Sequence, residues 1–410
     1  MVRPEPTTTQ LSVKRVELAH LDGFDDAERG SRMSTQDLTT VIDALPLVDH
    51  HVHGALAGSV DRPTLELLLT ESDRPVPPWM TQFDSQVGFA IRRFCAPELG
   101  LPAHADAADY VARREELGAE EVTRRLLTAS GVGHYLVETG YKGDELLSPA
   151  EMASASGVPA DEVVRLETVL EDLARDEIGA AELPSRFPEV LAERTTGAVA
   201  LKSVVAYRYG FDFDPERPSD AEVVAVAGNW LRSGSTRVDD PVLLRFLLWS
   251  GIDRGLPLQL HAGYGDPDVE LHRSDPLLLT RFIKLIEPSG VDLMLLHCYP
   301  FHRNAGYLAQ VFPRVYFDVG LGVNYSGVRS SAVVAESLEL APFAKILFSS
   351  DACGPPELHH LGALLWRRGM RKALSEWVAA GEWSEPDAIR VVRMIGRDNA
   401  RRIYRLGHRS

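Results

Sequence analysis

Residues 47–53 read Leu-Val-Asp-His-His-Val-His, and this stretch decides the predicted fold. Its apolar residues predict a β-strand, in which side chains two residues apart point to the same face. His51 and His53 therefore share a face, where two imidazoles are costly to bury without a polar partner. A bound metal ion is such a partner. His50 should face the other side of the strand and pack there or support its neighbours.

Further short apolar runs alternate with helical stretches along the chain. The other candidate strands are 134–138, 165–167 with its flanks, 198–207, 258–261, 293–297, 315–319 and 346–350. The run 165–167 also fits a helix over 163–173, and amphipathic segments such as 241–254 and 276–287 separate the later strands. Strands that alternate with helices predict parallel strands with right-handed crossovers. Eight such strands predict an α/β fold, a closed (β/α)₈ TIM barrel.

Polar side chains stand at the ends of several of these runs. His261 and His297 each close one apolar run, and Asp351 follows another. Because all strand C-termini of a parallel barrel open on the face that holds the active site, these residues should meet His51 and His53 there. Each one alone could be a hydrogen-bonded structural residue, but that interpretation fits five residues at four strand ends poorly. Imidazoles and a carboxylate suit Zn²⁺, or less often manganese or iron.

Lys202 lies within the run 198–207 and leaves three interpretations open. As a buried lysine it could be carbamylated and bridge two metal ions. It could instead bind a carboxylate of the substrate, or form a salt bridge with a neighbouring acid. The number of metal ions, one or two, depends on which interpretation holds.

Three other residues at strand ends are candidates for substrate binding. Glu138 closes the run 134–138, and Arg208 follows the run 198–207, where its guanidinium could clamp a carboxylate. Tyr264 lies in a glycine-rich turn after His261. Each of them could equally be structural. The same applies to a further group of residues near strand ends, namely Tyr207, Asp266, Tyr299, Arg303, Asp318 and Glu357. The histidines at 302, 359 and 360 are expected on the surface or in loops.

The regions before and within the predicted barrel differ in character. Residues 1–33 are polar and aperiodic and predict a flexible tail, and Met33 is an alternative translation start. Residues 34–410 form the predicted barrel domain. Within it, 55–130 is too long for a simple loop and carries helical patterns. We therefore expect a helical insertion on the first loop at the active-site face, which acts either as a lid or as plain packing.

Composition restricts the class of protein and its partners. Hydrophobic residues make up 45% of the 410 residues, and 59 acids against 43 bases give a formal net charge of −16. This acidity argues against nucleic acid or an anionic membrane as the main partner. Three cysteines without CxxC pairing fit a reducing cytoplasm, and no apolar run reaches the length of a membrane span. An isologous homodimer is the default expectation for assembly.

The ordered set of site residues resembles the amidohydrolase superfamily. The pattern comprises HxH on the first strand, a lysine on the fourth, histidines on the fifth and sixth, and an aspartate on the eighth. The ending 395–404 is similar to that family's C-terminal helix. The stretches 201–208, 258–266 and 296–300 resemble the amidohydrolase-2 type domain that is fused to, or encoded near, glutamine-synthetase-like proteins. This resemblance implies hydrolysis of a γ-glutamyl amide or a related C–N bond in a small, carboxylate-bearing molecule.

The resemblance also implies roles for the site residues. One metal would be held by His51, His53, His261 and Asp351. Asp351 would take the proton from the attacking water and pass it to the leaving nitrogen. His297 would polarise the scissile carbonyl, or bind a second metal together with Lys202. Arg208 and Tyr264 would orient the substrate.

Two alternatives to the hydrolase remain open at this point. The first is a metal-dependent, non-oxidative decarboxylase of the same fold, in which Arg208 holds the carboxylate. The second is a non-catalytic barrel that partners a glutamine-synthetase-like enzyme. Buried histidines argue against the second alternative, because a retired site has no physical reason to keep them.

Overall fold

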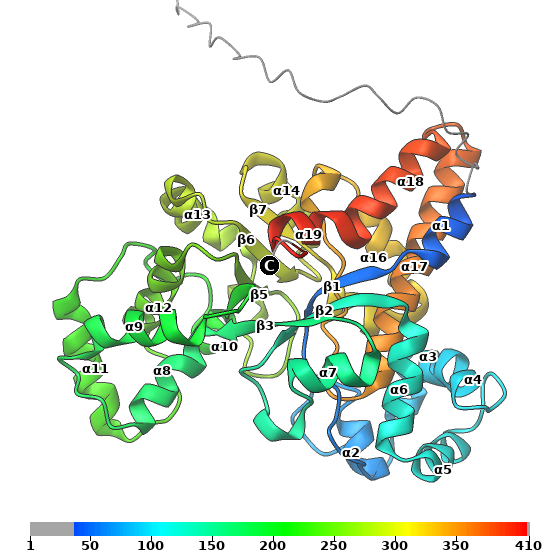
Figure 1. Cartoon of the computed structure of the whole chain (residues 1–410), viewed down its shortest axis with the longest axis horizontal. Coiled ribbons are helices and arrows are strands. Elements are labelled where there is room, and N and C mark those ends of the chain that lie inside the picture. The colour runs from blue at the N-terminus through cyan, green and yellow to red at the C-terminus, as the bar shows by residue number, and fades with distance from the viewer. Residues whose placement is uncertain (1–36, 408–410) are drawn as a thin grey trace, which may run out of the picture. The chain divides into compact units, whose positions relative to one another are not determined.

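The computed structural model describes residues 37–407, so the predicted tail 1–33 and the alternative start at Met33 lie outside the described residues. A seven-stranded parallel sheet forms the centre of this part of the chain, with its strands side by side in chain order (Figure 1). The strands are β1 Leu47–Val52, β2 Val132–Glu138, β3 Ala160–Arg165, β4 Ala200–Ser203, β5 Leu258–Ala262, β6 Leu293–His297 and β7 Val315–Phe317. Each strand is joined to the next by at least one helix, which parallel pairing requires.

An eighth segment completes the sheet without forming a regular strand. In the predicted strand 346–350, the amide of Leu347 donates to the carbonyl of Phe317 at the end of β7 (3.0 Å). On its other edge, the amide of His50 in β1 donates to the carbonyl of Phe348 (3.2 Å). The segment therefore bridges β7 and β1 and takes the place of the eighth strand. The predicted α/β TIM-barrel fold is confirmed.

Most predicted strands agree with the structure to within two residues at each end, and the limits of the third and fourth differ most. The third strand begins earlier, at Ala160, and ends at Arg165, where helix α8 (Leu166–Arg175) begins. The prediction of a strand through residue 167 is wrong because apolar side chains from Leu166 onward recur every three or four residues and are buried on one face of α8. The fourth strand ends at Ser203, and a short helix, α10 (Val205–Arg208), follows it.

Helices cover the sheet on its outside. They include α1 Leu38–Ala44, α7 Pro149–Ser156, α9 Leu183–Arg194, α11 Asp220–Ser233, α12 Pro241–Arg254, α13 Thr280–Ile286, α14 His302–Val311, α15 Gly320–Ser326, α16 Ser330–Ser337, α17 Pro356–Ala379, α18 Glu385–Arg393 and α19 Asn399–Ile403. The predicted helix 241–254 has the same limits as α12. In the segment 276–287, a 3₁₀ turn precedes α13.

Several short helices lie between β1 and β2. They are α2 Arg62–Leu67, α3 Gln86–Ala90, α4 Ala96–Glu98, α5 Ala107–Leu117 and α6 Ala119–Ser130, and Figure 1 shows them gathered beside α7. Helix α5 is tied to α17 by a buried contact, because Arg114 Nε donates to Glu357 Oε1 at 2.8 Å. The helices between β1 and β2 are therefore anchored to the barrel. Residues 68–81, called here the segment after α2, belong to this group.

Helix α17 corrects one expectation about histidines. His359 and His360 were expected at the surface or in a loop, but both are buried on α17, and His302 is buried at the start of α14. The reason is that α17 packs against α6, α15 and α16, so that most of its first four turns face other elements. Two adjacent histidines in a sequence do not show whether they are buried or exposed, because that depends on how many sides of their helix are covered.

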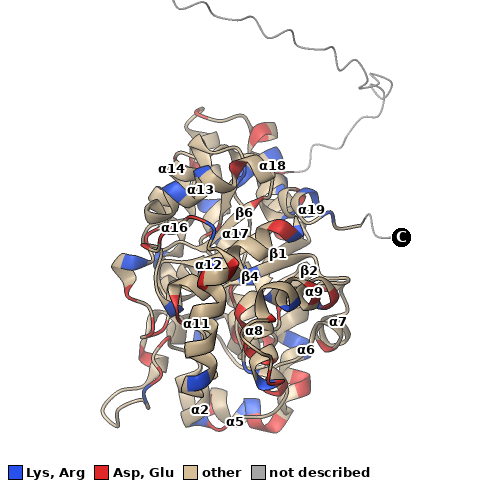
Figure 2. Ribbon diagram, turned by 90° about the vertical axis from the view of Figure 1, so that its left-hand side faces the viewer, with Lys and Arg blue, Asp and Glu red and all other residues tan. Residues whose placement is uncertain are grey.

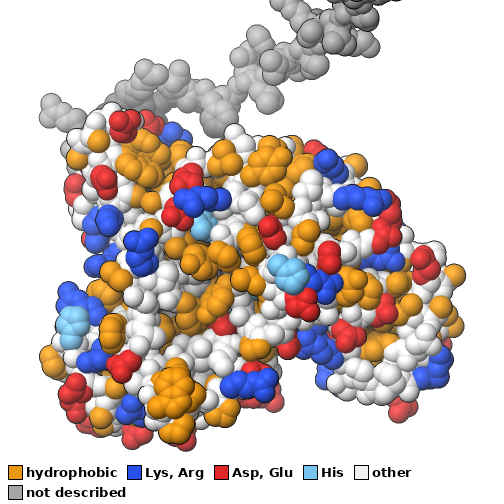
Figure 3. Space-filling model, turned by 180° about the vertical axis from the view of Figure 1, so that it is seen from behind, with side chains coloured by type: hydrophobic (Ala, Val, Ile, Leu, Met, Phe, Trp, Pro, Cys, Tyr) orange, Lys and Arg blue, Asp and Glu red, His pale blue; other side chains and the backbone are white. Residues whose placement is uncertain are grey.

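The outer surface carries mixed chemistry. On the side shown in Figure 2, basic and acidic residues alternate over the outer helices. On the opposite face from Figure 1, hydrophobic groups are separated by charged and polar side chains (Figure 3). Among residues 37–407, no helix combines the length and the hydropathy that crossing a membrane requires. A cluster of buried titratable groups lies at the barrel mouth.

Candidate metal centre and active site

A cavity of about 490 Å³ opens at the C-terminal ends of the strands. Its floor is formed by residues that end strands or follow them, and its wall includes the segment after α2. The lining includes His53, Arg165, Lys202, Tyr207, Arg208, His261, His297 and Asp351 from the barrel, and Leu68, Thr70 and Glu71 from the segment after α2. Side chains that were predicted to meet at the strand ends therefore line this cavity.

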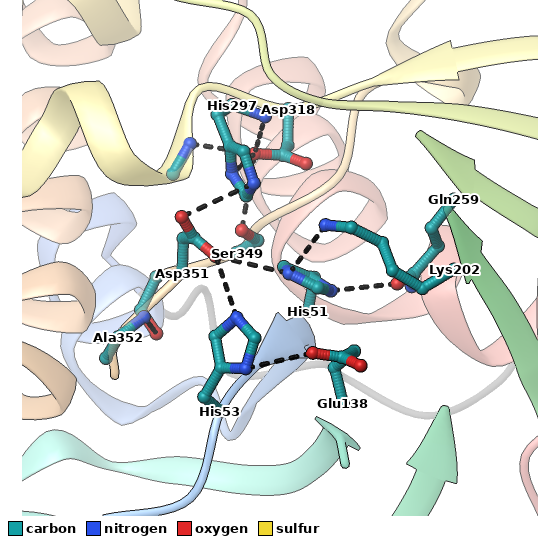
Figure 4. A network of polar contacts seen from close by, with 12 residues as sticks. His51, His53, Glu138, Lys202, Gln259, His297, Asp318, Ser349, Asp351 and Ala352 are labelled. Atoms are coloured by element: carbon teal, nitrogen blue, oxygen red, sulfur yellow. Dashed lines mark hydrogen bonds and ion pairs between the residues drawn. The ribbon is translucent and has the colours of Figure 1, made fainter. Parts of the chain in front are cut away.

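Asp351 lies at the centre of a cluster of imidazoles (Figure 4). Its Oδ1 is 3.2 Å from Nε2 of His51 and 4.0 Å from Nε2 of His53, and its Oδ2 is 3.3 Å from Nε2 of His297. One ligand atom each from His51, His297 and Asp351 lies within 4.8 Å of the others. This spacing is compatible with donors that share one ion.

Two residues behind the cluster fix the orientation of the imidazoles. His51 Nδ1 contacts Oε1 of Gln259 at 2.8 Å, and His53 Nδ1 is 3.1 Å from Oε2 of Glu138. Because an amide oxygen only accepts hydrogen bonds, Gln259 places the ring proton of His51 on Nδ1, and the negative charge of Glu138 beside His53 favours the same tautomer there. The lone pair of each Nε2 is then directed toward Asp351. Gln259 is itself held by a hydrogen bond from its Nε2 to the carbonyl of His50 (2.8 Å).

His261 stands beside this cluster rather than in its tightest part. Its ring centroid is 4.8 Å from that of His297 and 4.2 Å from that of Tyr207. Gly265 passes so close that a Cβ there would lie 2.2 Å from Tyr207 Oη and 3.0 Å from His261 Nε2. A glycine at this position therefore keeps space open in front of the imidazole nitrogen.

The polar atoms of the cluster fit a metal ion. Nε2 of His261, both ring nitrogens of His297 and Oδ1 of Asp351 are buried without a hydrogen bond. Leaving such atoms unpaired is costly, and most buried polar atoms in native proteins have a partner. Neutral imidazoles with a carboxylate are a common donor set for zinc and for related divalent metals. The residues present therefore fit a divalent cation that would satisfy these atoms together.

The backbone at two of these positions is strained. His297 and Cys298 have φ values of 66° and 51°, and Asp351 has a φ of 49°, all in the left-handed region. Such conformations cost about 1–3 kcal/mol each in non-glycine residues and concentrate at functional sites. Strain at two strand ends aims the side chains of His297 and Asp351 into the cavity.

Burial sets the protonation of the cluster. It lowers the pKa of His51, His261 and His297 well below the usual range, so these imidazoles are neutral and their lone pairs are available. Burial also raises the pKa of Asp351 well above its usual range, even though the nearby Lys202 opposes the shift. The imidazoles of the cluster therefore carry no positive charge, and the cluster would favour a cation supplied from outside.

Lys202 lies next to the cluster. Its Nζ is 3.2 Å from Nε2 of His51, and burial lowers its pKa to about 8. The salt-bridge interpretation of Lys202 does not describe this geometry, because its close polar contact within residues 37–407 is an imidazole and not a carboxylate. A lysine with a lowered pKa has a larger neutral fraction, which is the form that reacts to give a carbamate. Carbamylation and substrate binding both stay open.

Glu138 differs from its predicted role in substrate binding. Its two oxygens accept from Nε and Nη2 of Arg165 at 3.0 and 2.6 Å, and the carboxylate also faces His53. Burial alone would raise the pKa of Glu138, but Arg165 and His53 hold it well below its usual range. Glu138 is thus fully engaged by protein groups, and the structure places it behind His53 as its orienting carboxylate.

The other two substrate candidates lie at or near the cavity. Arg208 lines it, with Nη2 3.1 Å from Oε1 of Glu171, so its charge is already partly met. The ring of Tyr264 packs edge-on against Tyr325, which lines the cavity, with 5.8 Å between their centroids. Their part in binding substrate stays a prediction.

Some of the remaining candidates have structural partners. Glu357 pairs with Arg114, and Oδ2 of Asp318 contacts Nε2 of His50 at 3.0 Å. Arg303 pairs with Glu339 at the surface. These contacts account for the polarity of each residue without a ligand.

The sequence prediction missed several residues of the site, and Gln259, Arg165 and Glu71 show why. Gln259 had a detectable signal, because it lies two residues before His261 on the same strand and must share its face. Arg165 had only a weak signal, since it ends the strand whose limits the sequence left open. Glu71 belongs to the segment after α2, where no periodic pattern indicates which side chains face the barrel.

Comparisons with known proteins agree with this geometry. The model of the amidohydrolase family matches residues 169–406. Protein fluG of Emericella nidulans is 32% identical over 223 residues, which are 51% of this chain and 26% of that protein, so the chain spans about a quarter of its length. The crystal structure of a proposed metal-dependent hydrolase from Lactobacillus casei has a TM-score of 0.80 and 29% identity, and the match covers 90% of this chain and 97% of that one.

A more distant structure shares the fold. A uronate isomerase from Bacillus halodurans superimposes with a TM-score of 0.60 at 16% identity, over 90% of this chain and 95% of that one. At this identity the likeness concerns the barrel alone.

Proposed function

This chain belongs to the amidohydrolase family, and from that premise we propose that it is a metal-dependent hydrolase that cleaves an amide-type C–N bond in a small molecule. One observation carries the proposal. Neutral imidazoles and one carboxylate meet at the barrel mouth, and several of their buried polar atoms have no hydrogen-bond partner. A site that is only structural would not keep these atoms unpaired.

The donors for the metal are the residues at the strand ends. His51, His53, His261 and Asp351 would hold one divalent ion, which we expect to be zinc, or else manganese or iron. His297 and Lys202 would hold a second ion if the site takes two. When bound, such an ion lowers the pKa of a coordinated water to about 7 and polarises a carbonyl oxygen.

Asp351 is the proposed general base. Its carboxylate lies in the middle of the cluster and lines the cavity, so it can reach a water between the imidazoles and the substrate. It would accept the proton of the attacking water and deliver it to the leaving nitrogen, which makes the amine a better leaving group. His297, neutral because it is buried, could donate one hydrogen bond to the scissile carbonyl oxygen.

The substrate that fits best is a γ-glutamyl amide or a related amide that bears a carboxylate. Support comes from the cavity wall, where the guanidinium of Arg208 and the ammonium of Lys142 face the same space as the cluster. A planar guanidinium binds a carboxylate through two parallel hydrogen bonds. Arg208 would then hold the substrate carboxylate while the amide lies over Asp351.

Product analysis tests this proposal directly. The zinc-, manganese- and iron-loaded protein would be incubated with a panel of γ-glutamyl amides and anilides, and released amine and evolved CO₂ would both be measured. The proposal predicts amine release that stops when the metal is removed by a chelator. Evolution of CO₂ without amine would instead identify a decarboxylase. The absence of both products over the whole panel would favour a non-catalytic barrel.

A further inference from the structure

The charged groups that line the cavity differ in whether they have a partner. Each of the three arginines pairs with an acid: Arg165 with Glu138, Arg208 with Glu171 and Arg237 with Asp268. Lys142 and Lys202 also line the cavity, and neither forms an ion pair with Glu71 or Asp266. Glu71 and Asp266, by contrast, line the cavity without forming an ion pair with any cationic side chain among residues 37–407. The wall therefore holds two carboxylates whose charge the described part of the protein does not neutralise by direct contact.

Glu71 belongs to the segment that follows α2. Its carboxylate lies beside the hydroxyl of Tyr325 in α15, and this neighbour opposes the rise of its pKa. Asp266 comes from the loop after β5, where one of its oxygens accepts from the amide of Asp268 (2.9 Å). Two segments far apart in the sequence thus bring their carboxylates to one cavity.

Aromatic rings surround these carboxylates. Tyr141, Tyr207 and Tyr325 all line the same cavity. Carboxylates set among aromatic faces are a favourable environment for an organic ammonium, because the ring faces attract a cation while the carboxylates pair with it. A bare divalent metal would be less suited to this wall, because it prefers to be surrounded by oxygen ligands.

The burial of Glu71 agrees with a missing cation. Burial raises the pKa of Glu71 to about 7, and the neighbouring Asp266 adds to the shift, although the hydroxyl of Tyr325 opposes it. The pKa of Asp266 is raised as well, mainly by burial. Bringing a positive charge beside both groups would relieve this cost.

We propose that Glu71 and Asp266 form an ammonium-binding subsite, so that the substrate carries a protonated amino group in addition to its scissile amide. This proposal rests on the proposed function and narrows its substrate class to amino-acid-like amides. The amino group would lie against the segment after α2, with the amide over Asp351. Specificity would then come from a segment outside the regular barrel, whereas the chemistry comes from the strand ends.

Ligand binding tests the subsite without any need for turnover. The probes are L-glutamate and glutarate, which share both carboxylates and differ by the amino group. Calorimetry with the metal-loaded wild type should give an affinity for L-glutamate at least about tenfold higher than for glutarate, equal to about 1.4 kcal/mol. Glu71→Gln should bring this ratio close to one by weakening L-glutamate binding alone, and Asp266→Asn should lower it in the same direction.

A matched control separates a specific effect from a general loss of negative charge. Asp84→Asn also removes one charge from the chain between β1 and β2, but Asp84 is exposed and does not line the cavity. This variant should keep the wild-type ratio. Thermal melts of all three variants, followed by circular dichroism, should agree with the wild type, since both amide replacements retain an oxygen that accepts hydrogen bonds.

The outcomes distinguish failure of the subsite from failure of the hydrolase. Equal affinity for the two probes in the wild type, binding of neither, or an unchanged ratio in both Glu71→Gln and Asp266→Asn would overturn the subsite. Equal hydrolysis of γ-glutamyl and glutaryl anilides would also overturn it while leaving the hydrolase intact. A clear preference for L-glutamate in a protein that releases no amine from any amide would support the subsite and contradict the proposed function.

Discussion

Asp351 and Glu357 lie six residues apart, and both carboxylates are largely or fully buried. Glu357 contacts a cationic side chain, whereas Asp351 is surrounded by neutral ones. Oε1 of Glu357 accepts from Tyr110 Oη and Arg114 Nε, both at 2.8 Å, and these partners hold its pKa below the usual range despite burial. Asp351 is surrounded by neutral imidazoles, and burial raises its pKa well above the usual range. The difference teaches that burial alone does not mark a functional acid. The mark is burial without a cation supplied by the chain in direct contact.

Replacing Asp351 should give the largest effect on activity. Asp351→Asn keeps the size of the side chain and removes the base, so kcat for amide hydrolysis should fall by about 10³-fold. The melting temperature of the metal-free protein should stay the same or rise, because in that form the variant removes a buried acid that forms no ion pair with a lysine or arginine among residues 37–407. Steady-state kinetics and a thermal melt check both parts. Turnover near the wild-type level would mean that Asp351 is not the base.

Replacing Glu357 should lower the stability of the protein and leave its activity nearly unchanged. Glu357→Gln leaves the guanidinium of Arg114 buried without its counter-charge, which should lower the free energy of unfolding by about 3 kcal/mol. The kcat should change little, since Glu357 is paired with α5 rather than directed into the cavity. Urea unfolding and kinetics measure the two effects.

A double replacement sharpens this second prediction. Glu357→Leu combined with Arg114→Leu removes both charges and should recover part of the lost stability. A Glu357→Gln variant of normal stability and greatly reduced kcat would contradict the structural role of this pair.

Glu138 combines features of the structural acid Glu357 and of the site residue Asp351. It is paired with Arg165 like a structural acid, but it also orients His53 like part of the site. Glu138→Gln should weaken metal binding by about 10–100-fold, because the imidazole loses the carboxylate that fixes its ring proton. Competition against a chelator of known affinity measures this change. An unchanged metal affinity would show that His53 does not depend on Glu138.

The smallest predicted effect concerns His360, a buried histidine away from the cluster. Burial lowers its pKa from 6.5 to about 4. The unfolded chain therefore binds a proton as the pH falls through 6.5, whereas the folded chain does so only near 4, so stability is lost as the pH falls through this window. From about pH 7 to about pH 5.5, this histidine should contribute a loss of about 1 kcal/mol.

The matched variant isolates this contribution. His360→Gln should reduce the loss of unfolding free energy between the two pH values by that amount, as measured by urea unfolding. The same pH dependence in variant and wild type would contradict a neutral, buried His360 as its source.

The barrel and the floor of its site could be predicted because both depend on local patterns. Strand periodicity places His51 and His53 on one face, and barrel geometry brings His261, His297 and Asp351 to the same end. These residues stand at or next to the ends of well-marked apolar runs. The pattern is strong because each strand is buried and its limits are set by the change from apolar to polar residues.

The partners of these residues could not be predicted in the same way. The pairing of Glu138 with Arg165 depends on the register between β2 and β3, and the sequence did not fix the limits of β3. Glu71 reaches the cavity from the segment after α2, whose own residues show no period-2 or period-3.6 pattern. The burial of His359 and His360 likewise depends on how α17 packs.

Metal content tests the central claim most directly. Untagged wild-type protein, the His51→Ala/His53→Ala variant and Glu357→Gln would be analysed by elemental mass spectrometry. The account predicts one or two equivalents of zinc, manganese or iron in the wild type and in Glu357→Gln, and loss of metal in the double variant. Two equivalents would favour a carbamate on Lys202, and one would favour its role toward substrate. A wild type that stays metal-free after incubation with each ion would contradict the account.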